Sequence, residues 1–412
     1  PPPPPPPPSF QAEDGIRDMP TGLVGSEMCI RDRDKTTVAA ALGIAAVQRH
    51  YARVLVVTVD PARRLASALG LAEFGNEPVP IPGEAFEQAG LPVRGELHAA
   101  MLDTKAGWDA LIERHAPDAE VRKAVLGNPL YQNITGRFVH SHDYLAMEQL
   151  HDLHAAGEYD LVIVDTPPSR NAISILDAPG RMADFFGSRL LRWLTVPYRS
   201  RLFSMASRPF QQVADRILGS RFLQDIADFF ILFQTMESGF VKRAREVEAM
   251  LVDPRTAFVV VTTLETAPSH EAEYLAAALE RRGMPLGAVI ANRVLPPEIA
   301  SPEAADSAAR LASEAHGELA ERVADRLAET VDGEGDVPGS ELVGNVLADL
   351  SRRFDDIAVV AAREGDRRSD LEAVSPGVVT VPWMRGDIHD LAGLAELAGH
   401  LRGRPDGAES RR

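Results

Sequence analysis

Short apolar runs alternate with helical patterns along most of the chain. Residues 36–50 form an alanine-rich stretch with apolar positions at helical spacing, which predicts a helix, and residues 54–59 directly after it predict a buried strand. Four more short apolar runs predict buried strands, at residues 160–165, 257–261, 287–291 and 377–381. A further helix is predicted over residues 269–282, after a Pro-Ser start signal.

This alternation predicts an α/β fold with a mostly parallel, doubly wound sheet, whose ligands lie at the carboxyl ends of the strands. Asp60 and Asp165 each end a predicted strand, so both are expected at that edge. A helix that begins near Lys35 and a strand that ends at Asp60 make half of a nucleotide-binding βαβ unit. The residues before Lys35 contain no strand pattern that would supply the other half.

Long helical patterns separate the predicted strands, over residues 104–154 and 181–250. Large apolar residues between 222 and 233 share one helical stripe. Residues 181–210 carry six arginines and the single acid Asp184 in a chain that is otherwise acidic. This region is either a surface for a partner or a membrane, or the core of a helical subdomain with arginines around it.

The expected domain organisation follows from these segments. Residues 302–350 predict two acidic surface helices broken at residues 332–336. The sequence is divided into a leader (1–33), a discontinuous nucleotide-binding domain (34–103, 155–180 and 251–402), a helical insertion (104–154 and 181–250) and a flexible tail (403–412).

The leader opens with eight prolines, and residues 12–33 have neither strand alternation nor a helical stripe. That second stretch resembles translated sequencing-adapter sequence, so we interpret residues 1–33 as non-native or disordered. The alternative is a genuine proline-rich arm that acts as an extended spacer.

Composition narrows the class of protein. There are 43 lysines and arginines against 60 aspartates and glutamates, a formal net charge of −17, which disfavours nucleic-acid binding because phosphates repel an acidic surface. The only cysteine, Cys29, lies in the leader, so disulfides and cysteine-based metal sites are not expected. No apolar run reaches the roughly 20 residues of a membrane-spanning helix, and we expect a cytoplasmic protein.

Three strings carry the groups that a phosphate and magnesium site requires. In the string Lys35-Thr36-Thr37, the lysine offers an ammonium group for phosphate oxygens. The two threonines offer hydroxyls, and the Thr36 hydroxyl would bind the metal. Asp60 could orient an attacking water, and Asp165 could hold the magnesium shell; each could instead be a helix cap or turn residue. A complete phosphate loop also needs glycines before its lysine, and residues 28–34 contain none.

Several motifs resemble the ArsA family of anion-transporting ATPases, which includes the ATPases that target tail-anchored proteins. They are the segments 60–65 (DPARRL) and 165–172 (DTPPSRNA), which resemble its two switches, 292–294 (NRV), which resembles its adenine loop, and 381–391 (VPWMRGDIHDL), which resembles its closing segment. The resemblance implies a P-loop NTPase sheet with a helical insertion, ATP and Mg²⁺ as cofactors, and a homodimer or a heterodimer with a related ATPase.

The same resemblance implies the roles of individual residues. Lys35 would contact phosphate together with Thr36 and Thr37, and Asp60 would position the hydrolytic water. Thr36 and Asp165 would hold the metal. Adenine would lie among a set of three residues, Asn292, Arg293 and Pro382. The family also has a second signature lysine early in its phosphate loop. In this sequence the leader stands at that position.

The function expected from this resemblance is an ATP-hydrolysing switch that handles a hydrophobic protein or a membrane partner. A non-hydrolytic scaffold subunit is an alternative, because the glycines of the loop are missing. A second alternative is a partitioning ATPase. The acidic net charge and the helical insertion disfavour it, because such proteins usually need a basic face for DNA. Arsenite and zinc sites of the family use cysteines that are missing here outside the leader, and scattered histidines such as His140 and His151 fit no ligand template.

Overall fold

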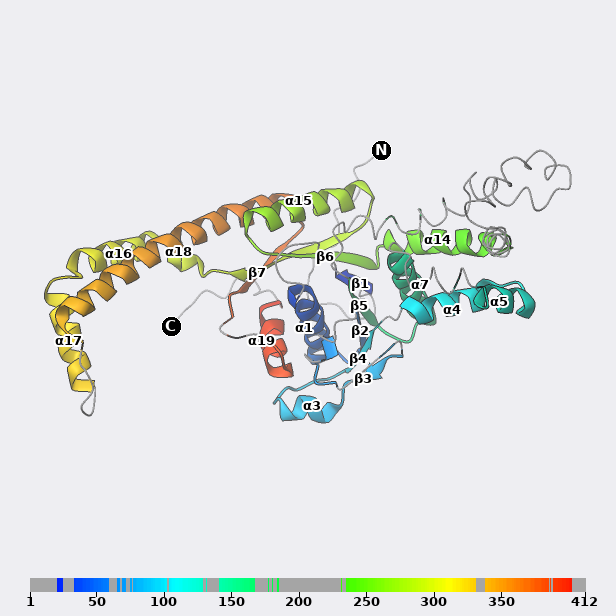
Figure 1. The fold of residues 1–412 in the computed structure, drawn as a ribbon, viewed down its shortest axis with the longest axis horizontal. Helices are drawn as coiled ribbons and strands as arrows, with labels where there is room; N and C mark the ends of the chain where they lie inside the picture. The colour runs from blue at the N-terminus through cyan, green and yellow to red at the C-terminus, as the bar shows by residue number, and fades with distance from the viewer. Residues whose placement is uncertain are drawn as a thin grey trace, which may run out of the picture.

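Eight strands form one sheet through the centre of the molecule (Figure 1). The computed structural model describes residues 21–24, 33–58, 65–66, 69–71, 75, 77–101, 104–128, 131, 141–166, 177, 180, 184, 231, 235–330, 338–384, 386 and 388–401. The strand order is β3-β4-β2-β5-β1-β6-β7-β8, and every pair is parallel except β3 with β4. The predicted mostly parallel α/β fold is confirmed.

The strands expected from apolar runs are present, with ends that differ by a few residues. The strands of the sheet are β1 (Thr21–Val24), β2 (Arg53–Thr58), β3 (Val79–Pro80), β4 (Glu96–Met101), β5 (Leu161–Asp165), β6 (Thr256–Thr262), β7 (Leu286–Val294) and β8 (Val378–Pro382). Most of their residues are buried, because helices cover both faces of a parallel sheet.

Three strands, β1, β3 and β4, lie where the sequence analysis predicted none, and β1 is the one next to the candidate site. β1 occupies the centre of the sheet, where Leu23 pairs with Val164 of β5 and Phe258 of β6. Four residues flanked by parallel strands take their hydrogen bonds from both neighbours, so they need neither alternation nor a long apolar run. The leader therefore contributes the strand that precedes α1 (Arg33–Arg49) and completes the βαβ unit.

Two apolar cores flank the sheet. On one face α1, α3 (Gly83–Gln88) and α19 (Leu391–Leu401) pack with residues such as Ile44 and Leu394. On the other face α7 (Ser141–Ala156), α14 (Glu237–Leu251) and α15 (Thr266–Arg281) pack against the sheet. Figure 1 shows α1 and α19 on one side of the strands and α15 on the other. The sheet is thus covered on both faces, as in doubly wound folds.

The region predicted as a helical insertion is helical wherever the structure describes it. It contains α4 (Thr104–His115), α5 (Ala119–Leu126), α7 and α14, which lie together at one end of the sheet (Figure 1). The apolar stripe at residues 222–233 and the arginines between 181 and 208 lie outside the described residues.

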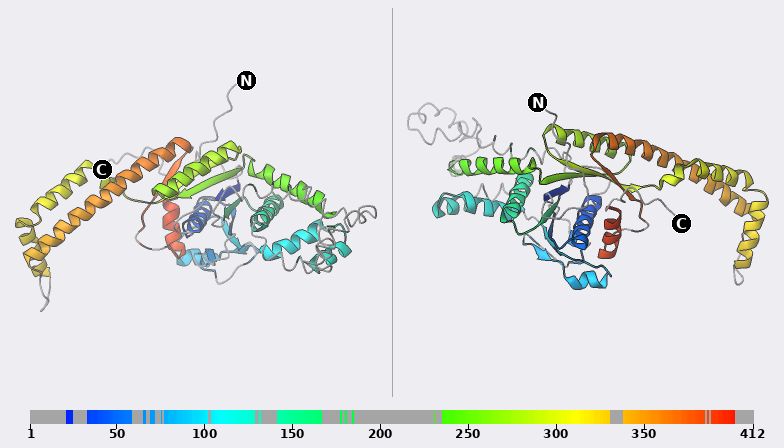
Figure 2. Two further views of the ribbon diagram at one scale, coloured as in Figure 1. Left: turned by 45° about the horizontal axis from the view of Figure 1, so that its top comes forward. Right: turned by 180° about the vertical axis from the view of Figure 1, so that it is seen from behind.

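A helical arm extends from the opposite end of the sheet. It consists of α16 (Pro302–Glu314), α17 (Glu318–Thr330) and α18 (Ser340–Val374), and both views of Figure 2 show it projecting from the sheet. The prediction of two helices ending at Leu350 was wrong, since three helices are present and α18 continues to Val374. The charged residues of α18 hid the continuation, because they alternate in sign without a wide apolar face.

Candidate functional site

Three residues from three elements meet at the carboxyl edge of the central strands. Asp165 is the last residue of β5 and pairs in register with Thr58, the last residue of β2. The Thr36 hydroxyl, in the first turns of α1, donates to Asp165 Oδ2 over 2.5 Å, and the Thr58 hydroxyl donates to the same oxygen over 3.1 Å. Asp165 is 1% exposed, so these bonds compensate for the burial of its charge.

This donor set fits magnesium. Mg²⁺ binds oxygen ligands, and a protein commonly supplies one or two of them while substrate phosphates and water supply the rest. Thr36 and Asp165 bring a hydroxyl and a carboxylate together at bonding distance. The described part of the chain contains no group of three or more His, Cys, Asp or Glu residues that could hold a metal by themselves. Beside the described residues, substrate phosphate and water are the ligands that would complete the coordination of a metal here.

Lys35 lies beside this pair on α1, and its side chain is buried. The amino-terminal end of a helix favours anions, because its N–H groups point outward and its dipole is positive there. A lysine in the first turn adds a full positive charge to that end. Thr37, also predicted to contact phosphate, is half-buried one residue further along the helix.

Asp60, the predicted water-positioning residue, lies outside the described residues. The strand that precedes it, β2, ends at Thr58, which contacts Asp165. Thr58 itself was missed by the sequence analysis. The sequence shows a hydroxyl residue near the end of a predicted strand, but only the pairing of β2 with β5 places it against Asp165.

The three residues predicted to frame adenine lie at the carboxyl ends of β7 and β8. Asn292 is buried in β7, and Arg293 after it has a φ of 60°, in the left-handed region. The pairing of β7 with β8 shifts register at this point, so that Val294 pairs with Pro382. The sheet thus brings Asn292, Arg293 and Pro382 to one corner of its edge.

Trp383 belongs to the same corner and had no role in the sequence analysis. Its backbone N–H donates to the Val294 carbonyl over 3.0 Å, and Arg293 Cζ lies 5.9 Å from the centre of its ring. The indole is 61% exposed, so a planar ligand could stack on it. Strands about 4.8 Å apart place the ends of β1 and β7 roughly 10 Å from each other, which one extended nucleotide can bridge.

The loop after this corner is tied to the arm. Glu364 of α18 accepts a hydrogen bond from the Leu295 backbone N–H over 2.8 Å. Burial and, to a smaller extent, nearby Glu265 raise the pKa of Glu364. The hydrogen bond from Leu295 lowers this pKa but offsets only part of the rise. α18 therefore holds the segment that directly follows the predicted adenine residues.

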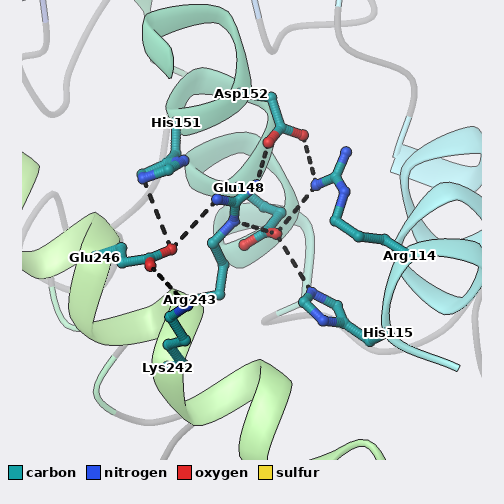
Figure 3. Close-up of polar contacts among 8 residues, drawn as sticks. All are labelled: Arg114, His115, Glu148, His151, Asp152, Lys242, Arg243 and Glu246. Atoms are coloured by element: carbon teal, nitrogen blue, oxygen red, sulfur yellow. Dashed lines mark hydrogen bonds and ion pairs between the residues drawn. The ribbon is translucent and has the colours of Figure 1, made fainter. Parts of the chain in front are cut away.

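A network of charged residues joins the helices of the insertion (Figure 3). Glu148 of α7 is almost fully buried and contacts Arg243 of α14 over 2.8 Å and Arg114 of α4 over 3.3 Å. Asp152 bonds to the same two arginines. Because the network joins α4, α7 and α14, it holds these three helices together.

Opposing effects act on the Glu148 carboxyl. Burial raises the pKa of Glu148, but the contacts with His115 and Arg243 outweigh it and hold that pKa below its ordinary value. The group is therefore ionised at neutral pH and paired, which is how buried charges are tolerated. These residues lie on the insertion helices, so we assign them a structural role.

Comparison with protein-family models matches residues 34–325 to the anion-transporting ATPase family, ArsA_ATPase. The chain belongs to this family. The match covers more than half of the chain and includes Lys35, Thr36, Asp60, Asp165 and Asn292. The family consists of ATP-binding ATPases with a P-loop NTPase fold, which agrees with the sheet described above.

Relatives among curated proteins are distant. Two are named "ATPase ASNA1 homolog": one from Entamoeba dispar, 23% identical over 64% of this chain and 73% of its own length, and one from Entamoeba histolytica, 24% identical over the same shares. Another relative, "Uncharacterized protein SCO2128" from Streptomyces coelicolor, is 28% identical over 64% of this chain and 60% of its own length. In the part of the chain that the structure describes, no helix is both long and apolar enough to cross a membrane.

Proposed function

We propose that the protein binds ATP with Mg²⁺ at the carboxyl edge of its sheet and hydrolyses it as a conformational switch. The observation that carries this proposal is the contact of Thr36 and Thr58 with one oxygen of Asp165. A helix start, two strand ends and a buried carboxylate converge there, although they are far apart in sequence. Family membership supports the same conclusion.

Each residue has a distinct task in this proposal. Lys35 holds the terminal phosphates at the amino-terminal end of α1, and Thr36 and Asp165 hold the metal. When bound, Mg²⁺ neutralises phosphate charge. Asn292, Arg293 and Pro382 frame the base at the ends of β7 and β8, so that the nucleotide lies across the edge of the sheet.

The reaction is hydrolysis of a phosphoanhydride bond, in which water attacks the terminal phosphorus and the diphosphate leaves. In such reactions the protein contributes mainly positioning and charge stabilisation. Asp60, two residues after the end of β2, orients the attacking water. Binding and hydrolysis would switch a dimer, homomeric or formed with a related ATPase, between closed and open states.

A hydrophobic protein segment or a membrane partner is the proposed cargo. The support is limited to the apolar helical patterns of the insertion and to the ASNA1 name of two relatives. The work done by hydrolysis would then be the capture and release of that partner.

The test is the steady-state ATPase rate of the wild type and of Asp60→Asn. The variant should bind ATP as the wild type does but turn it over at least 100-fold more slowly, because removal of one general base or water-orienting group has about that effect. Undiminished turnover would exclude Asp60 as the positioning residue.

The alternative is a scaffold subunit that does not hydrolyse ATP. The observation in its favour is that residues 28–34, directly before Lys35, contain no glycine, whereas a phosphate loop needs glycines to wrap its amides around an anion. Wild-type protein that binds ATP without measurable turnover would support the scaffold and refute the enzyme.

A further inference from the structure

The arm carries an apolar surface on the outer side of α18 that no described residue covers. Five residues form this outer stripe, each 44% to 57% exposed: Leu342, Val346, Leu350, Ile357 and Val360. At 3.6 residues per turn they fall within an arc of about 80° and span about 27 Å. The five residues recur along one side of the helix, with Arg353 between Leu350 and Ile357 on that side.

The other side of α18 is already used. Val343 and Ser351 are buried, and the Ser351 hydroxyl donates to the Ala308 carbonyl of α16 over 2.9 Å. Further along the helix, Leu371 lies on the same side as the stripe and is fully buried in the core next to the sheet. Between residues 342 and 360, α18 thus has an inner face that packs on α16 and an outer apolar stripe that stays about half exposed in the described structure. The arm that carries it projects from the sheet (Figure 2).

The spacing of the stripe is that of a helix-pairing seam. Positions 346, 350, 353, 357 and 360 are separated alternately by four and three residues, which is the repeat that keeps a seam facing a partner helix. Arg353 is the only charged member of that series. A flat surface or a small ligand would not require this period.

We propose that the occupant of the outer stripe is the same stripe of a second copy, with the two α18 helices antiparallel. A two-fold axis near residues 351 and 352 places Val346 opposite Ile357 of the second copy, and Leu350 opposite Arg353. Both contacts occur twice, as an isologous interface requires. At the centre of the stripe, Val346 and Ile357 then face each other, and Leu350 faces the aliphatic part of Arg353.

The charges at the centre of the stripe fit this pairing. Asp349 accepts from Arg353 of its own helix over 2.6 Å and contacts Arg352 over 3.4 Å. Around the proposed axis, Asp349 also lies within one turn of Arg352 and Arg353 of the second copy, and its own arginines lie near the second Asp349. Each Asp349 carboxylate therefore lies near two guanidinium groups of its own helix and two of the second copy. The charge of Arg353 in the seam is compensated by these carboxylates.

The pairing does not depend on nucleotide, so it is separate from the ATP-driven dimer proposed above. Sedimentation of the full chain without nucleotide should show a monomer–dimer equilibrium that persists in Lys35→Ala. Ile357→Glu should shift it to monomer, because Ile357 faces Val346 of the second copy. The matched control is Val359→Glu, because Val359 is similarly exposed on the same helix but lies about 160° away round it; it should still dimerise.

Cysteine crosslinking tests the orientation. In a Cys29→Ser background, Val346→Cys together with Ile357→Cys should form a disulfide-linked dimer under mild oxidation, whereas Val359→Cys should not. The proposal is overturned if the wild type is a monomer at every concentration, if Ile357→Glu dimerises as well as Val359→Glu, or if the paired cysteines do not link.

Discussion

Thr36 on α1 and Asp165 at the end of β5 share a hydrogen bond of 2.5 Å although 129 residues separate them in sequence. Thr58 joins the same carboxylate oxygen from β2. The relationship shows that the fold assembles a hydroxyl and a carboxylate, the oxygen ligands of a divalent cation, at the amino-terminal tip of a helix, which favours phosphate.

The Thr58 hydroxyl is expected to position Asp165. Thr58→Val keeps the shape but removes one hydrogen bond to a buried carboxylate, so the free energy of unfolding should fall by about 1–3 kcal/mol. Thr58→Ser retains the hydroxyl and should recover most of the loss. Urea denaturation measures both variants. Equal stability of Thr58→Val and wild type would contradict the positioning role.

The Glu148 network should make stability depend on pH. The pKa of Glu148 is lowered in the folded protein, so its contribution is complete above the unfolded pKa of 4.5 and is lost as pH falls through the folded value. Glu148→Gln should therefore lower the unfolding free energy at pH 7 by about 2 kcal/mol, because a hydrogen bond to a charged group is removed. The difference from wild type should shrink below the unfolded pKa.

Denaturant unfolding across a pH series measures this effect. Glu329→Gln is the control, because Glu329 is a solvent-exposed carboxylate that pairs with Arg326 over 3.7 Å. Exposed pairs are screened by water, so this control should not reduce stability measurably. A Glu148→Gln variant that is as stable as the control at neutral pH would show that the buried network is dispensable.

Trp383 should report base binding. Because its exposed indole lies beside Arg293 at the predicted adenine corner, ATP should change its fluorescence. The chain has three tryptophans, so Trp383→Phe is needed to assign the signal. The nucleotide-dependent change should disappear in Trp383→Phe, and ATP affinity should fall by severalfold. A signal that survives this substitution would place the base elsewhere.

Gly43 is expected to be required for the packing of α1 on the sheet. A Cβ there would lie 2.7 Å from Val56 Cγ2 and 3.1 Å from Leu97 Cδ1, so Gly43→Ala should destabilise the fold by about 1–3 kcal/mol. Gly399 on α19 meets no atom within 4 Å, and Gly399→Ala should leave stability unchanged or raise it by up to about 1 kcal/mol. Thermal unfolding distinguishes the two, and similar effects of both substitutions would refute the packing argument.

Strands made of β-branched residues could be predicted from the sequence, because runs such as Val54 to Val57 are favoured wherever both faces are buried. β4 could not. Its residues Glu96–Met101 include His98 and two alanines, which have low strand propensity. Pairing with all six residues of β2 determines its conformation, and such long-range context is not visible in a local pattern.

The candidate site was predictable in part. Lys35, Thr36 and Asp165 follow from motif chemistry, and the structure brings Thr36 and Asp165 into contact. Thr58 and Trp383 were missed, because their roles depend on strand register and on the shift between β7 and β8. A register is a property of two strands together, so neither strand alone reveals it.

The most direct test of the central claim is the affinity for ATP, measured by titration calorimetry with Mg²⁺ and with EDTA, for the wild type and for Thr36→Val. The wild type should bind at least tenfold more tightly with Mg²⁺, a difference of about 1.4 kcal/mol. Thr36→Val should lose that difference, because the hydroxyl next to Asp165 is gone. Wild-type binding that is equal in Mg²⁺ and EDTA, or a Thr36→Val variant that keeps the full magnesium effect, would contradict the account.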